Sequence, residues 1–256
     1  MDTAKRLLEI IDFDYPGLED ARTAYKEGDC EKAIECIVEH FRTRKDPKYL
    51  FRKEDTVFLD DPRIFEDAEK TMNHYIFSHQ FGEDIDFAFN PTAETSRDNE
   101  WTWSLYRTLY WQPLARAYAL TGDDRYVREF AKQLKKFYQT WPAEEYMNKT
   151  VAEIKQTFPG NAWRTIETAM RIYTTWLPLM EICRNSEAFD IETWTIFLSS
   201  VHDHAEFLLG HFSNHTKSSN WLSMECSGLL QMGIMFPEFR RAKLWKDTAY
   251  RRVMHE

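Results

Sequence analysis

The sequence predicts an all-α fold built of antiparallel helical hairpins, and three observations support this. Only 8 Gly and 9 Pro occur in 256 residues, too few for the many tight turns of a sandwich or barrel. Apolar residues recur at spacings of three and four in one segment after another. No segment alternates apolar and polar residues over any length, so little or no sheet is expected.

Two Gly-Asp pairs predict the turns of two hairpins. In "ARTAYKEGDCEKAIECIVEHF", Gly28 occupies the C′ position of one helix and Asp29 the N-cap of the next. The stretch "LARAYALTGDDRYVREFAKQLKKFY" repeats this arrangement with Gly122 and Asp123. Helices joined by so short a turn are antiparallel neighbours, so each stretch predicts one hairpin.

The remaining segments add further helices. A helix is predicted over "PRIFEDAEKTMNHY", because Pro62 suits a first helical turn. The rest of the stretch from Arg44 to Asn99 is expected to be ordered loop, since it is rich in Phe, Ile and Tyr. Four later segments each carry an apolar stripe one helix long: "NAWRTIETAMRIYTTWLPLMEIC", "DIETWTIFLSSVHDHAEFLLGHF", "SNWLSMECSGLLQMGIMF" and "PEFRRAKLWKDTAYRRVM".

Charge and hydropathy narrow the classes of partner and the compartment. A formal net charge of −9 gives no general attraction to nucleic acid or to an anionic membrane, so neither is expected as a partner. No stretch approaches the roughly 20 apolar residues of a membrane span, and the N-terminus is not a signal peptide. The chain as given is therefore expected in the cytoplasm, or in the periplasm or outside the cell if a signal has been removed.

Familiar metal and nucleophile motifs are missing from the sequence, and neither a metal nor a cofactor is predicted. His202 and His204 are two residues apart on a predicted helix, so they point in different directions and are expected to be structural. The cysteines show no CxxC spacing and are predicted to be buried thiols; they are Cys30, Cys36, Cys183 and Cys226.

The stretch "EWTWSLYRTLYWQPL" carries an aromatic and basic row. Trp103, Arg107 and Trp111 follow at intervals of four, so they are expected on one helical edge, with Pro113 kinking or restarting the helix. Two interpretations stay open. The row is either part of the core, or a platform for sugar rings beside an arginine that pairs with a carboxylate or sulfate.

A second charged row lies in the segment after Trp163. Arg164, Glu167 and Arg171 share one predicted helix face, and Glu167 is spaced to bridge both arginines. Such a row is usually a solvated surface. The flanking Trp163 and Trp176 favour a cleft border instead, so we predict a hydrogen-bonded network beside a cleft.

The stretch "HFSNHTKSSNWLSMECSG" places several polar groups directly before an apolar run. Asn214, His215 and Asn220 precede or adjoin Trp221 at the expected start of a helix. Such amides and an imidazole can cap the helix, or they can hold a substrate. The residues alone leave both interpretations open.

Taken in order, these motifs resemble the helical toroid domain of the heparinase II/III-like polysaccharide lyases. The resemblance runs from about Leu7 onward through "FNPT", "EWTWSLYR", "WRTIETAMRIYTTW" and "SNWLSMECSGLLQMGIMFPEF". It implies that residues 1–256 form an incomplete (α/α) toroid with a central cleft, which a β-sandwich domain normally follows. It also implies an acidic polysaccharide as partner and cleavage by β-elimination.

The resemblance assigns roles to residues of this chain. A lyase of this kind removes a proton beside a carboxylate, and a hydrogen bond to that carboxylate stabilises the transition state. Asn220 matches the neutralising amide, Trp221 stands where many relatives have His, and His215 is a candidate second neutraliser. Relatives commonly show Asn at the position of Tyr106, and their proton-transfer residues lie further along the chain. The expected substrate-binding residues are Trp101, Trp103, Arg107, Arg164, Glu167, Arg171, Asn214 and Trp221.

An alternative is a non-enzymatic helical-repeat module that binds a protein or a glycan. The sequence favours the lyase domain, because repeat arrays have a fixed period and no third Gly-Asp hairpin appears. The open end of an incomplete toroid is also expected to expose apolar surface, so the chain is expected to self-associate.

Overall fold

The computed structural model describes residues 3–49, 61–96, 98–156, 161–212 and 220–255, and it is helical through most of them, as predicted. The α-helices are α1 (Thr3–Ile10), α2 (Glu19–Lys26), α3 (Cys30–Thr43), α5 (Arg63–Met72), α6 (Glu100–Arg107), α7 (Gln112–Thr121), α8 (Arg125–Thr140), α9 (Val151–Gln156), α10 (Thr165–Arg171), α11 (Leu177–Cys183), α12 (Ile191–Gly210), α13 (Asn220–Met235) and α14 (Ala242–His255). Shorter elements are the strands β1 (Tyr75–Ile76) and β2 (His79–Gln80), the 3₁₀ turns η1 (Leu109–Trp111) and η2 (Ala143–Glu145), and the π-helical turn η3 (Ile172–Trp176).

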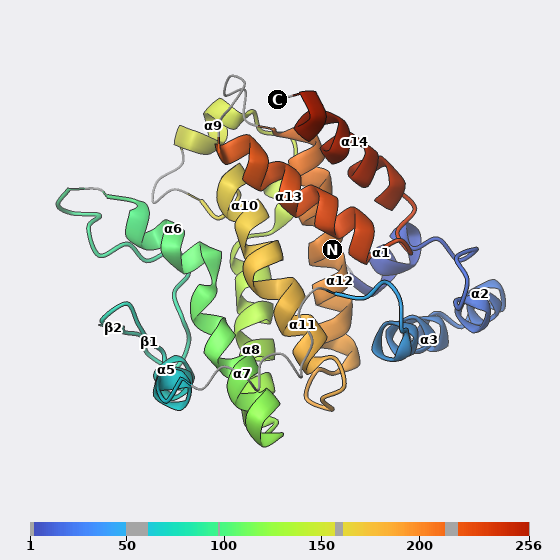
Figure 1. The fold of residues 1–256 in the computed structure, drawn as a ribbon, viewed down its shortest axis with the longest axis horizontal. Coiled ribbons are helices and arrows are strands. Elements are labelled where there is room, and N and C mark those ends of the chain that lie inside the picture. Colours follow the sequence, from blue (N-terminus) through green and yellow to red (C-terminus); the bar gives the residue numbers. More distant parts are fainter. Residues whose placement is uncertain (1–2, 50–60, 97, 157–160, 213–219, 256) are drawn as a thin grey trace.

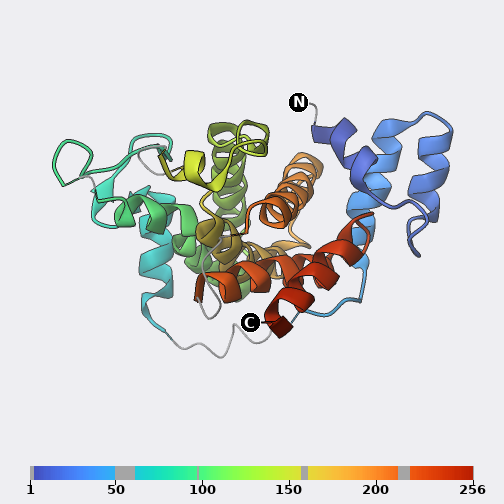
Figure 2. The ribbon, with the colours of Figure 1, turned by 90° about the horizontal axis from the view of Figure 1, so that it is seen from above.

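Consecutive helices pair as hairpins, and the hairpins line up side by side. The pairs α2–α3, α7–α8 and α13–α14 are in contact along their lengths (Figure 1). Seen from above, the helices extend from α5 and α6 at one end to α2 and α3 at the other (Figure 2). The helix α12 lies in the middle and is apolar on nearly all sides, because α1, α8, α10 and α13 pack around it.

Both Gly-Asp turns form, although the N-cap of α8 is Asp124 and not Asp123. Gly28 and Gly122 adopt φ values of +84° and +70°, a region that glycine enters without steric cost. The Asp29 carboxylate accepts a hydrogen bond of 2.9 Å from the backbone N–H of Lys32 and so caps α3. Asp123 accepts one of 2.9 Å from the N–H of Arg125 at the start of α8.

The long helical segment from Thr165 to Cys183 contains an irregular turn that the sequence pattern did not reveal. Its middle, Ile172–Trp176, is π-helical. Pro178 has no N–H to donate to the carbonyl four residues back, and the Gln112 side chain donates to that carbonyl of Thr174 at 2.8 Å instead. This side chain therefore ties α7 to the π-helical turn.

The expected continuous helix through Trp103, Arg107 and Trp111 is wrong. The helix α6 ends at Arg107, and Thr108 takes a left-handed conformation with φ +55° before the 3₁₀ turn η1. Trp111 is fully buried and stacks on Trp176 with 6.0 Å between ring centroids. For Trp111, the core interpretation of the aromatic row is the correct one.

Two smaller predictions also need correction. Cys183 and Cys226 are buried, but Cys36 is partly exposed and Cys30 is exposed, because Cys30 opens α3 at a turn on the surface. The helix predicted to run to Tyr75 ends at Met72, and a two-stranded antiparallel hairpin follows it, in which Tyr75 pairs with Gln80.

The surface of the described residues shows where apolar side chains meet solvent. None of the described helices is both long and apolar enough to cross a bilayer. Exposed apolar side chains gather on α14, where they are Leu244, Tyr250, Val253 and Met254. Self-association through such a surface stays a prediction.

The helices α10 and α13 touch closely enough that one glycine is required between them. A Cβ atom at Gly228 would lie 2.9 Å from the Cα atom of Ala169. Gly228→Ala should therefore push the two helices apart and lower the free energy of unfolding by about 1–3 kcal/mol in urea denaturation. Gly210→Ala is the control, because a Cβ there meets nothing within 4 Å. Equal stability of the two variants would contradict this contact.

Candidate functional site

Three helices meet at Arg164, the residue that precedes α10. Its guanidinium carbon lies 3.7 Å from the ring centroid of Trp103 in α6 and 4.3 Å from that of Trp221 in α13. A planar guanidinium is attracted to the electron-rich faces of indole rings. This side chain therefore joins α6, α10 and α13 through cation–π contacts.

Glu167, in the first turn of α10, binds two arginines at once. Its Oε1 atom accepts hydrogen bonds from Arg164 Nη1 at 3.1 Å and from Arg107 Nη2 at 2.9 Å. Arg107 Nη1 also donates to the Oε1 atom of Glu100 at 2.7 Å. The Glu167 side chain is completely buried, whereas that of Glu100 is 56% exposed. The cluster therefore runs from a buried carboxylate to the surface.

Burial sets the protonation energetics of this cluster. It raises the pKa of Glu167 above its ordinary value, although both arginines oppose this shift. It also lowers the pKa of Arg164, against the attraction of Glu167. For Arg107, burial would lower the pKa, but the hydrogen bonds and charges of Glu100 and Glu167 outweigh it and raise the pKa. The charges depend on one another, because none of them is fully solvated.

Two backbone irregularities hold Arg107 in place at the end of α6. The left-handed Thr108 is buried, and its Oγ1 atom accepts a hydrogen bond of 3.2 Å from Trp176 Nε1. Thr175 Oγ1 donates to the carbonyl of Arg107 at 3.3 Å. The π-helical turn is thus hydrogen-bonded to the last residue of α6 and to the residue that follows it. Sequence reasoning missed both threonines, because a β-branched residue gives no signal for a left-handed turn.

Arg171 does not belong to the site, contrary to the prediction. Its side chain is fully buried; its Nε atom donates to His204 Nε2 at 2.7 Å, and its Nη1 atom donates to the carbonyl of Ala162 at 2.6 Å. Trp163 and Trp176 are buried as well. Glu167 bridges Arg164 with Arg107, and not with Arg171, because Arg171 turns into the core.

His204 has the structural role that was expected of it. Its Nδ1 atom donates to the carbonyl of Ser200 at 2.6 Å, so its Nε2 atom is free to accept from Arg171. Both partners suit a neutral imidazole. Burial, with the positive charge of Arg171, holds the pKa of His204 well below its ordinary value. No cluster of three potential metal ligands occurs among the described His, Cys, Asp and Glu residues.

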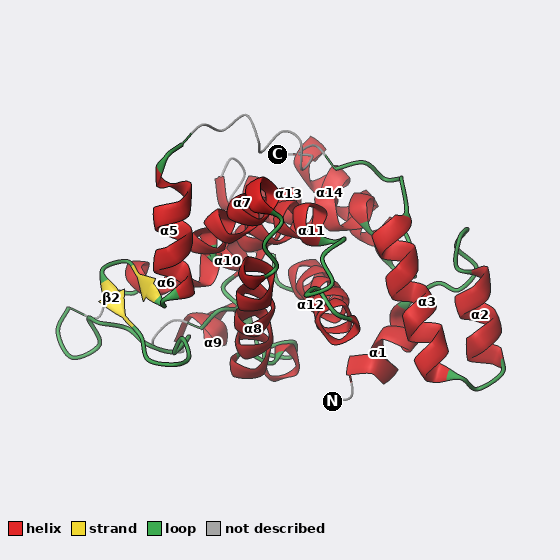
Figure 3. Cartoon of the chain, turned by 90° about the horizontal axis from the view of Figure 1, so that it is seen from below, coloured by secondary structure: helices red, strands yellow, loops and turns green. Residues whose placement is uncertain are grey.

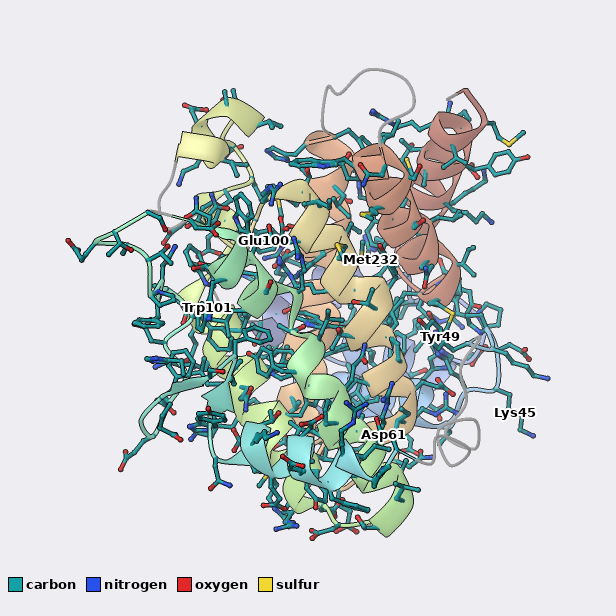
Figure 4. The ribbon with its side chains drawn as sticks, turned by 60° about the vertical axis from the view of Figure 1, so that its left-hand side comes forward. Lys45, Tyr49, Asp61, Glu100, Trp101 and Met232 are labelled. Atoms are coloured by element: carbon teal, nitrogen blue, oxygen red, sulfur yellow. The ribbon has the colours of Figure 1, made fainter. Side chains whose placement is uncertain are left out.

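The two tryptophans of α6 have different surroundings, and Trp101 does not join the arginine cluster. Residues two apart on a helix point to nearly opposite sides. Trp101 packs edge-on against Phe77 and Phe89, with ring centroids 5.8 Å and 5.5 Å away. Figure 4 shows the neighbouring residues Glu100 and Trp101 on α6. Trp101 therefore lies apart from the Arg164 cluster, and its role in substrate binding stays a prediction.

The start of α13 contacts the cluster through Trp221. Asn220 is the first residue of α13 and is exposed, and its neighbour Trp221 contacts Arg164. Neither Trp103 nor Arg107, both of which are described, forms a hydrogen bond with Asn220. Asn214 and His215 lie outside the described residues, so their assigned roles stay predictions.

This helical domain contains a buried carboxylate, two arginines paired with it, and flanking indole rings. Comparisons with known proteins show its family. Residues 7–256 match the heparinase II/III N-terminus family, and the chain belongs to it. The predicted resemblance is confirmed.

Curated relatives are similar over nearly the whole chain. It is 28% identical to a heparin-sulfate lyase of Bacteroides stercoris over an alignment of 258 residues, gaps included. The alignment covers 94% of this chain and 37% of that protein. It is 27% identical to the heparin-sulfate lyase of Pedobacter heparinus, with coverages of 93% and 35%. The chain therefore spans little more than a third of the length of these relatives.

This chain also matches solved structures over a similar share of their length. A heparinase III gene product superimposes with a TM-score of 0.82 at 26% identity, covering 97% of this chain and 38% of that one. The heparan sulfate lyase HepC from Pedobacter heparinus gives a TM-score of 0.78 at 25% identity, with coverages of 96% and 38%. This likeness confirms the predicted helical-toroid class.

The buried carboxylate makes a prediction about stability. Glu167→Ala leaves Arg164 and Arg107 without their shared partner, and should lower the free energy of unfolding by about 3 kcal/mol at neutral pH. Glu167→Gln should lose less, because its amide oxygen still accepts a hydrogen bond. Urea denaturation measures both, with the exposed Glu187→Ala as control, expected within about 0.5 kcal/mol of wild type. If Glu167→Ala matches that control, the bridge contributes nothing.

Proposed function

We propose that this chain is the toroid domain of a polysaccharide lyase, and that it binds an acidic, uronic-acid polysaccharide and takes part in β-elimination. The observation that carries the proposal is the Arg164, Glu167 and Arg107 cluster, which is in contact with Trp221, the residue after Asn220. Membership of the heparinase II/III N-terminus family and the similarity to heparin-sulfate lyases support the same substrate class.

The two arginines of the cluster carry one positive charge more than the buried carboxylate of Glu167 neutralises. Arg164 and Arg107 share the single carboxylate of Glu167, and the second negative charge comes from Glu100. Because Glu100 is largely exposed, water screens its pairing with Arg107 and makes it weak. A carboxylate or sulfate of a sugar can therefore replace Glu100 at little cost, and it accepts two parallel hydrogen bonds from a guanidinium.

The indole rings next to the cluster suit the other parts of a sugar. Trp103 and Trp221 are both partly exposed, and they hold the Arg164 guanidinium in one orientation. A held guanidinium loses less conformational entropy when it binds an anion than a mobile one does. The rings also offer apolar surface for the C–H groups of a pyranose.

Asn220 supplies the group that β-elimination needs beside this anion site. Removing a proton next to a carboxylate creates a dianion, and a hydrogen bond from an amide to that carboxylate lowers the barrier. Asn220 is exposed at the first turn of α13, one residue from Trp221. In this proposal the two arginines hold the acidic sugars, Asn220 neutralises the reacting carboxylate, and the proton acceptor comes from another part of the lyase.

A substitution at Asn220 tests this role. In a lyase that carries this domain, Asn220→Ala should lower turnover by roughly a hundredfold or more, the scale for removal of one hydrogen-bond donor to the transition state. The measurement is the ultraviolet absorbance of the unsaturated uronate product, on heparan sulfate, heparin, chondroitin sulfate and alginate. The melting temperature should change little, because Asn220 is exposed.

Ser223→Ala is the matched control, because Ser223 is exposed on the same helix and should be neutral. Full activity of Asn220→Ala would remove Asn220 from the mechanism. Binding of acidic oligosaccharides without any unsaturated product on the whole panel would favour the alternative, a non-enzymatic binding module.

A further inference from the structure

A groove with aromatic walls lies between α5 and the β1–β2 hairpin, on the side of α6 opposite to the Arg164 cluster. It encloses about 200 Å³ and is walled by Tyr75, Phe77 and Tyr110, with Asp67 and Lys70 at its rim. The hairpin stands beside α5 and α6 in Figure 3. Trp101 packs against its tip, and not against the arginine cluster. The groove is therefore separate from the Arg164 site.

The hairpin turn holds Phe77 in a conformation that its residue type disfavours. Phe77 and Ser78 connect the two strands with φ values of +49° and +65°, which a turn of this kind normally assigns to Asn and Gly. Strained backbone of this sort gathers at binding sites, where it positions a particular side chain. Here it places a phenyl ring on the surface, 44% exposed, where a more relaxed residue would serve the turn better.

The aromatic side chains at the groove contact one another and together form its wall. The Phe77 ring meets Trp101 and Tyr110 edge-on, with centroids 5.8 Å and 6.1 Å away. Tyr75, 41% exposed, adds a further ring to the wall. Rings arranged in this way present faces and edges to a flat ligand of about one ring in size, which a groove of this volume accommodates.

The charges at the rim decide which ligand fits. Lys70 Nζ lies 2.8 Å from Glu66 Oε1 and 3.2 Å from Asp67 Oδ1, so two carboxylates surround one ammonium group. Lys70 is therefore neutralised by its two carboxylate partners, and it offers little attraction to a sulfate or carboxylate. The same groups accept and donate hydrogen bonds to hydroxyls. Aromatic walls with such a rim are suited to an uncharged sugar.

We propose that this groove binds one uncharged sugar ring of a glycan, stacked on Phe77 and Tyr75 and hydrogen-bonded by Asp67 and Lys70. This site goes beyond the proposed lyase function, because it lies apart from Asn220 and recognises sugars that carry no acid group. A glycan with both acidic and neutral units can then be held at two points of the domain.

Direct binding to the 256-residue chain tests the groove without any turnover. Isothermal titration uses cellotetraose and N-acetylchitotetraose as uncharged probes and a heparin tetrasaccharide as the sulfated one. Phe77→Asn removes the ring but suits the left-handed backbone, so it should weaken binding of an uncharged probe tenfold or more while the melting temperature stays or rises. The matched control is Phe65→Asn: Phe65 in α5 is equally exposed, at 44%, lies outside the groove and should keep full affinity.

Tyr75→Ala is the second variant, and it should weaken the same binding without changing the fold, because Tyr75 is exposed. The proposal is overturned if neither uncharged probe binds at millimolar concentration, or if Phe77→Asn and Tyr75→Ala both bind like wild type. It is also overturned if the heparin tetrasaccharide alone binds and does so independently of Phe77. Loss of lyase turnover in Asn220→Ala bears only on the proposed function, so the two ideas fail separately.

Discussion

The buried carboxylate of Glu167 is the interaction on which the arrangement of α6, α10 and α13 depends. It accepts hydrogen bonds from Arg164, which precedes α10, and from Arg107, the last residue of α6. Arg164 in turn packs against Trp103 and Trp221. A buried ion pair adds little net stability over apolar packing, but removal of one partner leaves an uncompensated charge. The cluster therefore fixes the geometry of the site more than it stabilises the fold.

Packing elsewhere makes this cluster possible. The close contact of Gly228 with Ala169 lets α13 approach α10, so that Trp221 reaches Arg164. On the other side, the left-handed Thr108 ends α6 at Arg107, and the π-helical turn of Ile172–Trp176 hydrogen-bonds that end. The left-handed residue and the π-helical turn are both locally unfavourable, and both help to position Arg107. The groove at Phe77 follows the same rule, with strain again placing one side chain.

Local rules predicted the helices and turns well, and tertiary packing decided the rest. Gly28 and Asp29 could be assigned from sequence, because a C′ glycine and an N-cap depend on a few neighbouring residues. The Arg164–Glu167 pair was also predictable from its spacing. Arg171 was misplaced, since spacing alone does not tell a core face from a cleft face. The break at Thr108, which separates Trp111 from Arg107, depends on a hydrogen bond from Trp176, 68 residues away in the chain.

The most direct test of the central claim is the affinity of Arg164→Lys for an acidic uronate oligosaccharide. Lysine keeps the positive charge, but it cannot stack its head group on Trp103 and Trp221 or offer paired N–H donors. If the oriented guanidinium binds the sugar acid, isothermal titration of the 256-residue chain should show affinity lower by about tenfold or more, with the fold retained by circular dichroism. Affinity equal to wild type would contradict the account, because charge alone would then suffice.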